Sequence, residues 1–363
     1  MLTLGIETSC DETALALVQD GKLISEALAS QVDVHALFGG VVPEIASREH
    51  LRLLPVLYKQ LMERTGVAPA DLDCISVARG PGLLGSLLMG VSFAKGLCLG
   101  LNKPLVGVNH LHAHLLASGL EQDIAYPALG LLVSGGHTHI YLVKSPSEFE
   151  LLGKTLDDAA GEAFDKVAKA LNFPYPGGQY IDKLAQGTEP DRKLFPRPYI
   201  SNDNLDFSFS GVKTAVANYI QKNPELVAAS MYSAEQLKEL LEASDVDEKT
   251  EHLRSVCSSF NWCVAETLRI KMERALKRVL ETTKVESILV AGGVAANTGV
   301  RASMTSLSRA YKIKLILPSL QLCTDNAAMI AYTGQLLFAK GFRHDLTLEA
   351  IPRGRAVPED WVS

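Results

Sequence analysis

The chain lacks the marks of a secreted, disulfide-rich or membrane-embedded protein. Its six cysteines are scattered, and no two of them stand in C-x-x-C spacing, which excludes a zinc ribbon and indicates reduced thiols. The longest apolar run, from Leu83 to Ala94, is shorter than a bilayer-spanning helix requires and is followed by Lys95. The sequence opens on the strand-like Leu2 to Ile6 and not on a basic and then apolar targeting signal. We therefore expect a cytoplasmic location and no membrane partner.

The net negative charge is confined to one segment. The formal net charge of −6 argues against tight nucleic-acid binding by the chain alone. Residues 223–251 hold eight acids and two bases, which accounts for the whole excess, so the remainder of the chain is neutral. A basic run follows from Arg269 to Arg278 on a helical pattern. This run is either a solvated helix face or a surface that contacts RNA.

Length and composition indicate an α/β protein of about two domains, because 363 residues with 47% hydrophobic and 21% charged residues exceed one small core. Alternating and helical apolar patterns then divide the chain into elements. The strands are expected near residues 2–8, 13–19, 22–29, 73–79, 104–109, 128–134, 138–144, 149–153, 285–290 and 313–317. Long helices are expected near residues 43–64, 83–100, 158–171, 178–187, 251–281, 296–309 and 325–340.

Two segments of the chain repeat one pattern. Gly5, Ser9 and Thr13 recur at the same gaps as Gly130, Ser134 and Thr138, and each segment is typical of a strand, a polar turn and a second strand. On this alignment Glu12 corresponds to His137. Each copy later reaches a strand that ends in a glycine turn, at Gly80 and at Gly292. The pattern predicts a duplicated α/β domain with a cleft between two lobes, where turn N–H groups can bind phosphate.

Three histidines stand within five residues, at 110, 112 and 114. If His110 opens a helix, His110 and His114 share one face, while His112 points away. Asp325 can complete a two-histidine, one-carboxylate set with vacant coordination positions, as zinc or ferrous iron allows. The alternative is that Asp325 caps the helix that follows it. The first reading predicts a catalytic or substrate-orienting metal site.

The sequence lacks the motifs of two other kinds of site, the zinc-peptidase site and the P-loop nucleotide site. No glutamate of the H-E-x-x-H type stands between His110 and His114, which excludes the zinc-peptidase mechanism, and no Walker P-loop occurs. Two stretches are candidates for the walls of the cleft: residues 160–167, with Glu162 and Asp165 on a helix, and residues 175–182, with a Gly-Gly turn before Asp182. Each is equally consistent with a surface helix or loop.

Taken together, these motifs resemble the bacterial tRNA threonylcarbamoyladenosine transferase subunit, a family formerly called the O-sialoglycoprotein endopeptidase or glycoprotease family. The resemblance runs from residue 2 to about residue 345, and the ETSCDET opening resembles the bacterial and mitochondrial branch. The motifs that carry it are residues 5–13, 39–48, the His110/His114 pair, 134–138, 209–214 and 292–297. The departures are Leu111, His112 and Ala113, where the family often has Met-Glu-Gly, and Gln179, where a proline is common.

The resemblance implies a duplicated actin-like fold, the two-lobe fold of acetate and sugar kinases, Hsp70 and actin, which is related to ribonuclease H. It implies transfer of a threonylcarbamoyl group from its adenylate to N6 of the adenosine beside the tRNA anticodon. A metal, Fe²⁺ before Zn²⁺, is then expected at His110, His114 and Asp325. The nucleotide, threonylcarbamoyl-AMP or ATP, is expected at Val133, Ser134, Gly135, Gly136, His137, Asp165, Gly178, Asp182 and Asn297. Partners in the bacterial branch are a degenerate paralogue that forms a heterodimer and a small P-loop ATPase, with tRNA bound through its anticodon loop by the complex.

Asp11 and Glu12, on the first predicted hairpin turn, are the candidate proton-accepting or orienting carboxylates, because the exocyclic amine of adenine is a poor nucleophile. Cys10 is either a covalent nucleophile or a packed turn residue. Two rival functions remain: an actin-like ATP phosphotransferase acting on a small substrate, and a non-catalytic nucleotide-binding scaffold. The predicted domains are an N-terminal lobe of residues 1–109, a C-terminal lobe of residues 110–345 and a tail of residues 346–363. The second lobe contains a metal-site helix at 110–120 and a helical insertion at about 155–280, within which the acidic residues 223–251 form a surface segment.

Overall fold

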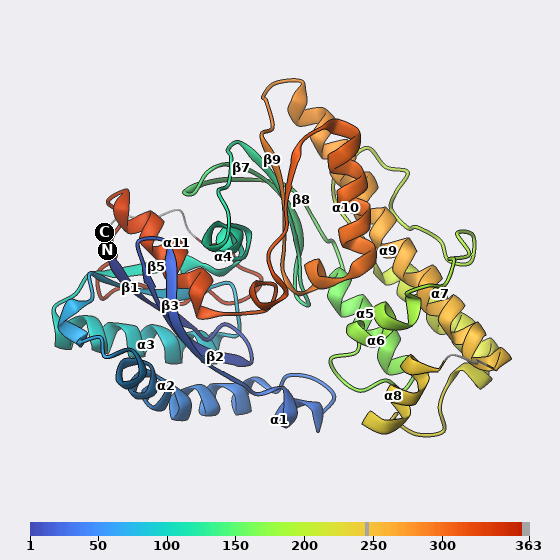
Figure 1. Cartoon of the computed structure of the whole chain (residues 1–363), viewed down its shortest axis with the longest axis horizontal. Coiled ribbons are helices and arrows are strands. Elements are labelled where there is room, and N and C mark those ends of the chain that lie inside the picture. Colours follow the sequence, from blue (N-terminus) through green and yellow to red (C-terminus); the bar gives the residue numbers. More distant parts are fainter. Residues whose placement is uncertain (244–246, 358–363) are drawn as a thin grey trace. The chain divides into compact units, whose positions relative to one another are not determined.

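The computed structural model describes residues 1–243 and 247–357, which form two compact α/β units (Figure 1). Unit 1 consists of Met1–Ile124, Lys144–Phe149 and Pro318–Ser363, and unit 2 of Ala125–Val143 and Glu150–Leu317. The predicted lobes of residues 1–109 and 110–345 do not coincide with these units. The helix that follows residue 109 and the last helix of the chain both belong to unit 1, because they pack together and against its sheet.

Unit 1 is built on a five-stranded sheet in the order β3-β2-β1-β4-β5. β1 pairs antiparallel with β2 and parallel with β4. Its strands are β1 (Leu2–Glu7), β2 (Glu12–Gln19), β3 (Lys22–Ser30), β4 (Cys74–Gly80) and β5 (Leu105–Asn109). Its helices are α1 (Val32–Ala36), α2 (Pro43–Thr65), α3 (Leu84–Leu101), α4 (His110–Leu116) and α11 (Ala327–Ala339). Short 3₁₀ turns lie at Pro69–Asp71, Ala117–Leu120 and Leu320–Leu322.

The two faces of β2 differ in side-chain size, and this difference places α11. Leu15 and Leu17 join the core formed with α2 and α3, whereas Ala14 and Ala16 pack against Ala327 and Ala328 at the start of α11. On β1, a Cβ atom added to Gly5 would lie 2.5 Å from both the Ala327 carbonyl oxygen and the Ala331 nitrogen. Small residues therefore allow α11 to lie directly on the sheet, with the residues just before it at the carboxyl end of β1.

Unit 2 is built on a second five-stranded sheet, in the order β10-β9-β6-β7-β8. Its strands are β6 (Ala128–Val133), β7 (Thr138–Ser145), β8 (Glu148–Lys154), β9 (Ser287–Ala291) and β10 (Lys314–Ile316), and the β7–β8 tip is grouped with unit 1. Its helices are α5 (Ala160–Ala170), α6 (Gly178–Ala185), α7 (Ser210–Lys222), α8 (Ala234–Glu242), α9 (Glu248–Leu280) and α10 (Thr298–Tyr311). Short 3₁₀ turns lie at Pro224–Leu226 and Gly293–Ala296.

The predicted duplication is confirmed by topology and by strand register. Read from β8 to β10, the second sheet has the same order as the first, with the third, second, first, fourth and fifth strands of its own unit in sequence. Glu7 pairs with Ala14, and Leu132 and His139, each 125 positions later, pair in the same way. The aligned hairpins thus have one pairing register. The fourth strands also end alike, at Gly80 with φ +144° and near Gly292 with φ +90°.

All ten predicted strands and all seven predicted long helices are present; α7 and α8 fall in the predicted helical insertion but had not been given bounds, and the short α1 had not been predicted. The apolar run from Leu83 to Ala94 forms the start of a longer helix, as the predicted helix over residues 83–100 indicated. That helix, α3, extends to Leu101, and its 18 residues, with a mean hydropathy of 1.6, are long and apolar enough to cross a membrane by length and composition alone. In the fold, α3 packs on β4 and α2, and Leu87, Val91 and Ala94 are buried. That position is the usual one for an apolar helix in an α/β layer.

Candidate active site

Two histidines of α4 lie side by side in unit 1. Asn109 ends β5 and caps α4, because its side-chain oxygen accepts hydrogen bonds from the Leu111 and His112 nitrogens at 3.0 and 3.4 Å. The helix starts at His110, so the His110 and His114 rings come within 4.6 Å, centroid to centroid. The His112 ring instead stacks on Phe149 at 3.8 Å. The predicted difference in direction between His112 and the other two histidines is confirmed.

Asp325 lies against this pair. Its Oδ1 is 3.0 Å from His114 Nε2 and 3.6 Å from His110 Nε2, and one potential ligand atom from each of the three residues lies within 4.8 Å of the others. The cap of α11 is Asn326, whose side chain accepts from the Met329 nitrogen at 2.8 Å. Asp325 is therefore not the helix cap, and the alternative reading of this residue is wrong.

The donor set fits a divalent metal. Both imidazoles are buried, Asp325 is partly exposed, and the buried Nδ1 of His114 has no hydrogen-bond partner. Two imidazole nitrogens and one carboxylate oxygen suit Zn²⁺ or Fe²⁺ and leave coordination positions vacant. Acidic groups also gather here: burial, together with the charges of Asp325 and Asp11, raises the pKa of Glu12 to about 9, and, against the effect of burial, Glu7 and Asp325 raise the pKa of His110 to about 9. A bound cation would favour the ionised carboxylates of this cluster.

The turn between β1 and β2 carries the two candidate carboxylates. Asp11 is buried and Glu12 is half-buried. Cys10 precedes them, and burial and Asp11 raise the pKa of its thiol well above the usual range, so the nucleophilic thiolate is disfavoured. The packed-residue reading of Cys10 is the one that this environment supports.

A buried histidine of α2 holds this turn in place. His50 Nε2 donates to the Cys10 carbonyl oxygen at 2.9 Å, and His50 Nδ1 lies 2.7 Å from the Thr13 hydroxyl oxygen. Gln31 extends the network, since its amide Nε2 lies 3.4 Å from His50 Nδ1 and its Oε1 lies 3.2 Å from His35 Nε2. The motif at residues 39–48 lies just before His50 on α2. Through its contacts with Cys10 and Thr13, His50 holds the turn that carries Asp11 and Glu12.

The His50 contacts predict a dependence of stability on pH. Burial lowers the pKa of His50 from 6.5, so the unfolded chain takes up a proton below about pH 6.5 that folded His50 resists. The free energy of unfolding of the wild type should fall between pH 7 and pH 5, with a slope of up to about 1.4 kcal/mol per pH unit from this group. A His50→Gln variant, measured by urea unfolding, should show a smaller slope. Equal slopes in the two proteins would contradict the prediction.

The glycine turn of the second hairpin lies in unit 2, against the start of α5. Ser134 Oγ accepts from the Gly136 and His137 nitrogens at 3.3 and 3.1 Å, and the Gly161 nitrogen of α5 donates to the Ser134 carbonyl oxygen at 3.2 Å. Gly135 is exposed, and a Cβ atom added to it would meet no atom within 4 Å. Val133 ends β6, and its carbonyl oxygen would lie 2.5 Å from a Cβ on Gly292. The structure thus brings the predicted turn, α5 and the glycine turn after β9 together.

Asp165 lies on α5 beside the predicted Gly-Gly turn. Its Oδ1 accepts from both the Gly177 and Gly178 nitrogens, at 2.9 and 3.2 Å. Burial raises the pKa of this carboxyl group from its usual value. Because one oxygen receives both N–H groups, the other oxygen is the candidate contact for a ribose hydroxyl.

Asp182 and Asn297 are joined by a residue that the sequence did not reveal. The Asp182 carboxylate accepts from the Thr298 nitrogen and hydroxyl at the start of α10, at 3.1 and 2.8 Å, and from the Asn261 amide at 3.1 Å. The Asn261 oxygen in turn accepts from Asn297 Nδ2 at 2.8 Å, while Asn297 Oδ1 caps α10. Asn261 is buried in the middle of α9, and no local motif marks it. A polar residue on an apolar helix face was the only available signal.

The basic run of α9 is largely engaged inside unit 2. Lys271 Nζ donates to the Asn202 side-chain oxygen and the Asn204 carbonyl, and burial and Arg274 lower its pKa to about 8. Arg274 donates to the carbonyls of Ile200 and Asn202, and Arg278 donates to that of Asp203. These cations anchor the loop that precedes α7. Charge reversal at Arg274 or Arg278 would release this loop, so it does not test RNA contact by itself.

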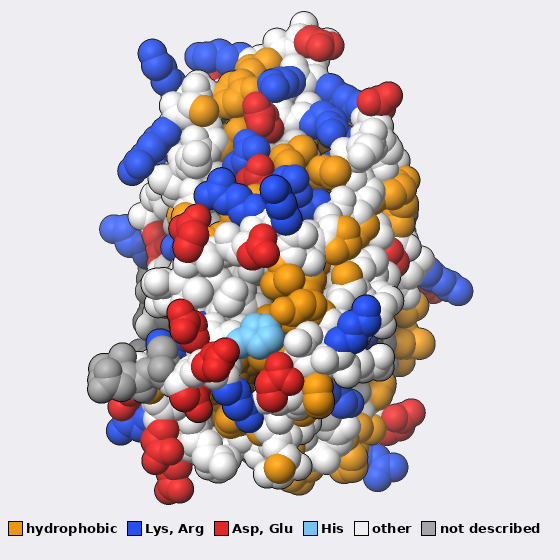
Figure 2. Space-filling view, turned by 90° about the vertical axis from the view of Figure 1, so that its right-hand side faces the viewer, with side chains coloured by type: hydrophobic (Ala, Val, Ile, Leu, Met, Phe, Trp, Pro, Cys, Tyr) orange, Lys and Arg blue, Asp and Glu red, His pale blue; other side chains and the backbone are white. Residues whose placement is uncertain are grey.

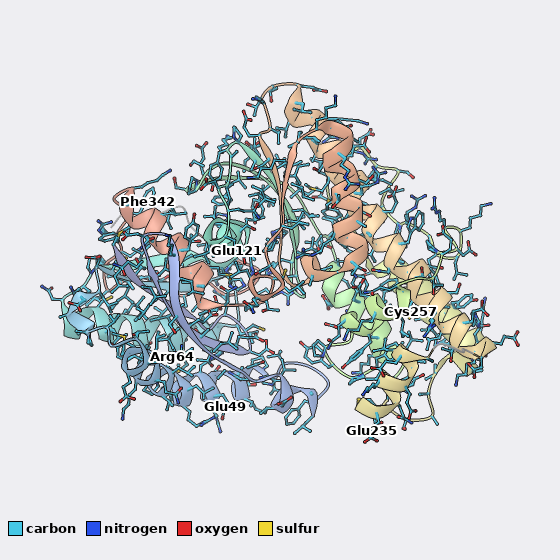
Figure 3. The ribbon with its side chains drawn as sticks, in the orientation of Figure 1. Glu49, Arg64, Glu121, Glu235, Cys257 and Phe342 are labelled. Carbon is cyan, nitrogen blue, oxygen red and sulfur yellow. The ribbon has the colours of Figure 1, made fainter. Side chains whose placement is uncertain are left out.

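The acidic segment of residues 223–251 is anchored by apolar side chains. Leu226 and Leu237 are buried, and the Tyr232 ring lies 5.2 Å from the Phe173 ring. Its acids are exposed: Glu235 lies on the outer side of α8 (Figure 3). On the face of unit 2 that carries α7, α8 and α9, Figure 2 shows basic side chains gathered mainly in the upper half, while acidic side chains occur in both halves. Asp245, one of the eight acids, lies outside the described residues.

Comparison with known proteins decides the family. The sequence profile described as tRNA N6-adenosine threonylcarbamoyltransferase matches residues 22–332. The chain belongs to this family. The relative of that name from Maridesulfovibrio salexigens is 61% identical over 362 residues, covering 100% of this chain and 99% of the relative. Family members from Nitratidesulfovibrio vulgaris strain DP4 and from Thermosipho africanus are 58% and 46% identical, covering 99% and 97% of this chain and 98% and 99% of their own.

Solved structures support the fold. The HypF protein of T. kodakarensis superposes with a TM-score of 0.54 at 14% identity, covering 99% of this chain and 49% of its own. At that identity the likeness concerns the fold alone. With the repeated strand order of the two sheets, it confirms the predicted duplicated, actin-like α/β architecture in this member of the family.

Proposed function

We propose that this chain transfers the threonylcarbamoyl group from threonylcarbamoyl-AMP to N6 of the adenosine beside the anticodon, in tRNAs that read codons beginning with adenine. The observation that carries the proposal is full-length identity of 46 to 61% with relatives named for this reaction. The His110–His114–Asp325 group agrees with it. Two imidazoles and a carboxylate with vacant positions suit a site that orients or polarises a substrate.

The chemistry needs an activated carbonyl and a positioned amine. The donor is a mixed carbamic–phosphoric anhydride, so AMP leaves readily. A metal held by His110, His114 and Asp325, with Fe²⁺ as the first candidate and Zn²⁺ as the second, would supply Lewis acidity. Asp11 and Glu12 then orient the N6 amine or accept its proton once the new carbon–nitrogen bond has formed. Their turn is held by His50, which keeps both carboxylates at the carboxyl end of β1.

In unit 2, the turn Val133–His137 is the proposed contact for the adenylate phosphate. Ser134 Oγ orders the Gly136 and His137 nitrogens, and such turns form concave anion sites. Asp165 and the Gly178 turn are assigned to the ribose. Asp182 and Asn297 are assigned an indirect role, in which they fix the start of α10. The Asp182 carboxylate is not free to bind the nucleotide, because it already accepts hydrogen bonds from Thr298 and Asn261.

We also propose that the chain acts in a cytoplasmic complex with a degenerate paralogue and a small P-loop ATPase. The supporting observation is a set of exposed leucines on two packed helices of unit 1: Leu51 of α2 is 65% exposed, and Leu84 and Leu88 of α3 are 48% and 42% exposed. Ser47 of α2 lies against Gly85 of α3, which brings the three leucines onto neighbouring turns. Grouped exposed leucines indicate a protein-binding surface. The net charge of −6 also favours a partner that adds phosphate contacts.

The test is nucleoside analysis of tRNA incubated with preformed threonylcarbamoyl-AMP. The chain with its paralogue and ATPase should produce threonylcarbamoyladenosine, and the isolated chain should be much slower. A matched tRNA carrying guanosine in place of the target adenosine should stay unmodified. No product from the full assembly would overturn the proposed transfer. Equal rates for the isolated chain and the assembly would overturn only the partner requirement.

A further inference from the structure

Glu7, the last residue of β1, is a fully buried carboxylate beside the two histidines. Its Oε2 lies 3.0 Å from His110 Nδ1, and its Oε1 accepts a hydrogen bond from the Ser9 nitrogen at 2.5 Å. The Ser9 hydroxyl lies 3.2 Å from the same His110 Nδ1. A buried carboxylate is costly unless it is paired, so these contacts explain how the strand accommodates it.

The duplicated hairpin provides an internal comparison. Glu7 and Leu132 occupy equivalent positions, since each pairs with the equivalent residue of the neighbouring strand in the same register. Leu132 is buried and apolar. The strand position itself therefore accepts leucine, and the fold does not require a carboxylate there. The acid is present only in the unit that carries the His110–His114–Asp325 group.

The contact also determines which histidine nitrogen is available. An ionised carboxylate only accepts hydrogen bonds, so His110 Nδ1 must carry the proton that it donates to Glu7. In the neutral ring the other nitrogen, Nε2, then has the lone pair that a metal requires, and it faces Asp325 at 3.6 Å. Histidines that bind metals usually donate their second ring N–H to a carboxylate or carbonyl, which fixes the tautomer and the ring orientation.

We propose that Glu7 is a positioning residue that holds His110 in the Nδ1–H tautomer, with Nε2 directed at the metal. This inference rests on the proposed metal at His110, His114 and Asp325. Ser9 supports the arrangement, because its backbone nitrogen holds the second oxygen of Glu7. Glu7 does not bind the metal itself.

The test measures Zn²⁺ affinity of the purified full chain by competition with a chromogenic chelator. Glu7→Gln should weaken binding about 10- to 100-fold, because one amide oxygen cannot accept from both Ser9 and His110. Glu7→Leu, which copies Leu132, should weaken it at least as much and keeps the test valid if the glutamine variant fails to fold. Glu12→Gln is the matched control: it makes the same substitution in the neighbouring acidic turn, away from His110 Nδ1, and should cost clearly less. Equal losses for Glu7→Gln and Glu12→Gln would overturn the proposal.

A second experiment tests the His110 tautomer directly in the wild-type protein. Long-range ¹H–¹⁵N correlation spectra of the Zn²⁺-loaded protein should show a protonated His110 Nδ1 and a metal-bound Nε2. A metal-bound Nδ1 would overturn the assignment of Glu7. If the wild type bound no Zn²⁺, or if His110→Ala/His114→Ala bound it unchanged, the proposed metal site would fail instead, so the two failures are distinguishable.

Discussion

Bound metal should fall from one ion per chain in the wild type to none detectable in the His110→Ala/His114→Ala double variant. The variant keeps only the partly exposed Asp325, and a single carboxylate does not hold Zn²⁺ or Fe²⁺ against dilution and dialysis. Formation of threonylcarbamoyladenosine by the assembled complex should be lost with the metal. Elemental analysis of anaerobically purified protein and nucleoside analysis of tRNA measure the two effects.

The chain offers a matched control on the same helix. His112→Ala removes an imidazole of equal size from α4, but its ring stacks on Phe149 and not on the site. This variant should retain stoichiometric metal. Undiminished metal in the double variant would refute the site, and equal loss from His112→Ala would show that the effect comes from damage to α4.

Gly135→Ala should weaken binding of threonylcarbamoyl-AMP roughly 10- to 100-fold, the value of one or two hydrogen bonds to a charged group. Gly135 is exposed, and its added Cβ meets no protein atom within 4 Å, so the folded protein has room for the methyl group. A phosphate held by the N–H groups of this turn would lose that space. The effect should therefore be confined to the ligand, with an unchanged melting temperature.

Isothermal titration with a non-hydrolysable adenylate analogue measures this loss. Gly96→Ala on α3 is the control, because Gly96 is also exposed and its Cβ also meets nothing within 4 Å. Replacing glycine by alanine within a helix should slightly raise stability, and it should leave nucleotide affinity unchanged. Unaltered affinity in Gly135→Ala would place the phosphate elsewhere.

Residue patterns predicted the strands and the duplication because both depend on local apolar alternation and on spacings between glycine, serine and threonine. The histidine pair was also predictable, since helical periodicity alone places His110 and His114 on one face. Asp325 remained ambiguous from sequence. Its role depends on whether Asp325 or Asn326 caps α11, and only the packing of α11 on Gly5 and the alanines of β2 brings Asp325 to the histidines.

Residues that act across long sequence separations could not be predicted. Asn261 joins Asp182 and Asn297 from the middle of a long helix, and Glu7 reaches His110 across 103 positions. The anchoring role of Lys271 and Arg274 was hidden for the same reason, because the loop carbonyls that they bind carry no side-chain signature. The bounds of α7 and α8 were not predicted, although Ser233 and Gln236 form a capping box at the start of α8 that is visible in the sequence.

The equal register of the two hairpins gives one backbone scaffold two opposite electrostatic characters. Between paired strands with the same geometry, the first turn carries the acids Asp11 and Glu12, while the second carries the glycines Gly135 and Gly136. In the proposed function one turn lies beside a cation and the other binds an anion, and the difference resides in a few side chains rather than in the path of the chain. Each turn could change its ligand preference while the sheet beneath it stayed the same.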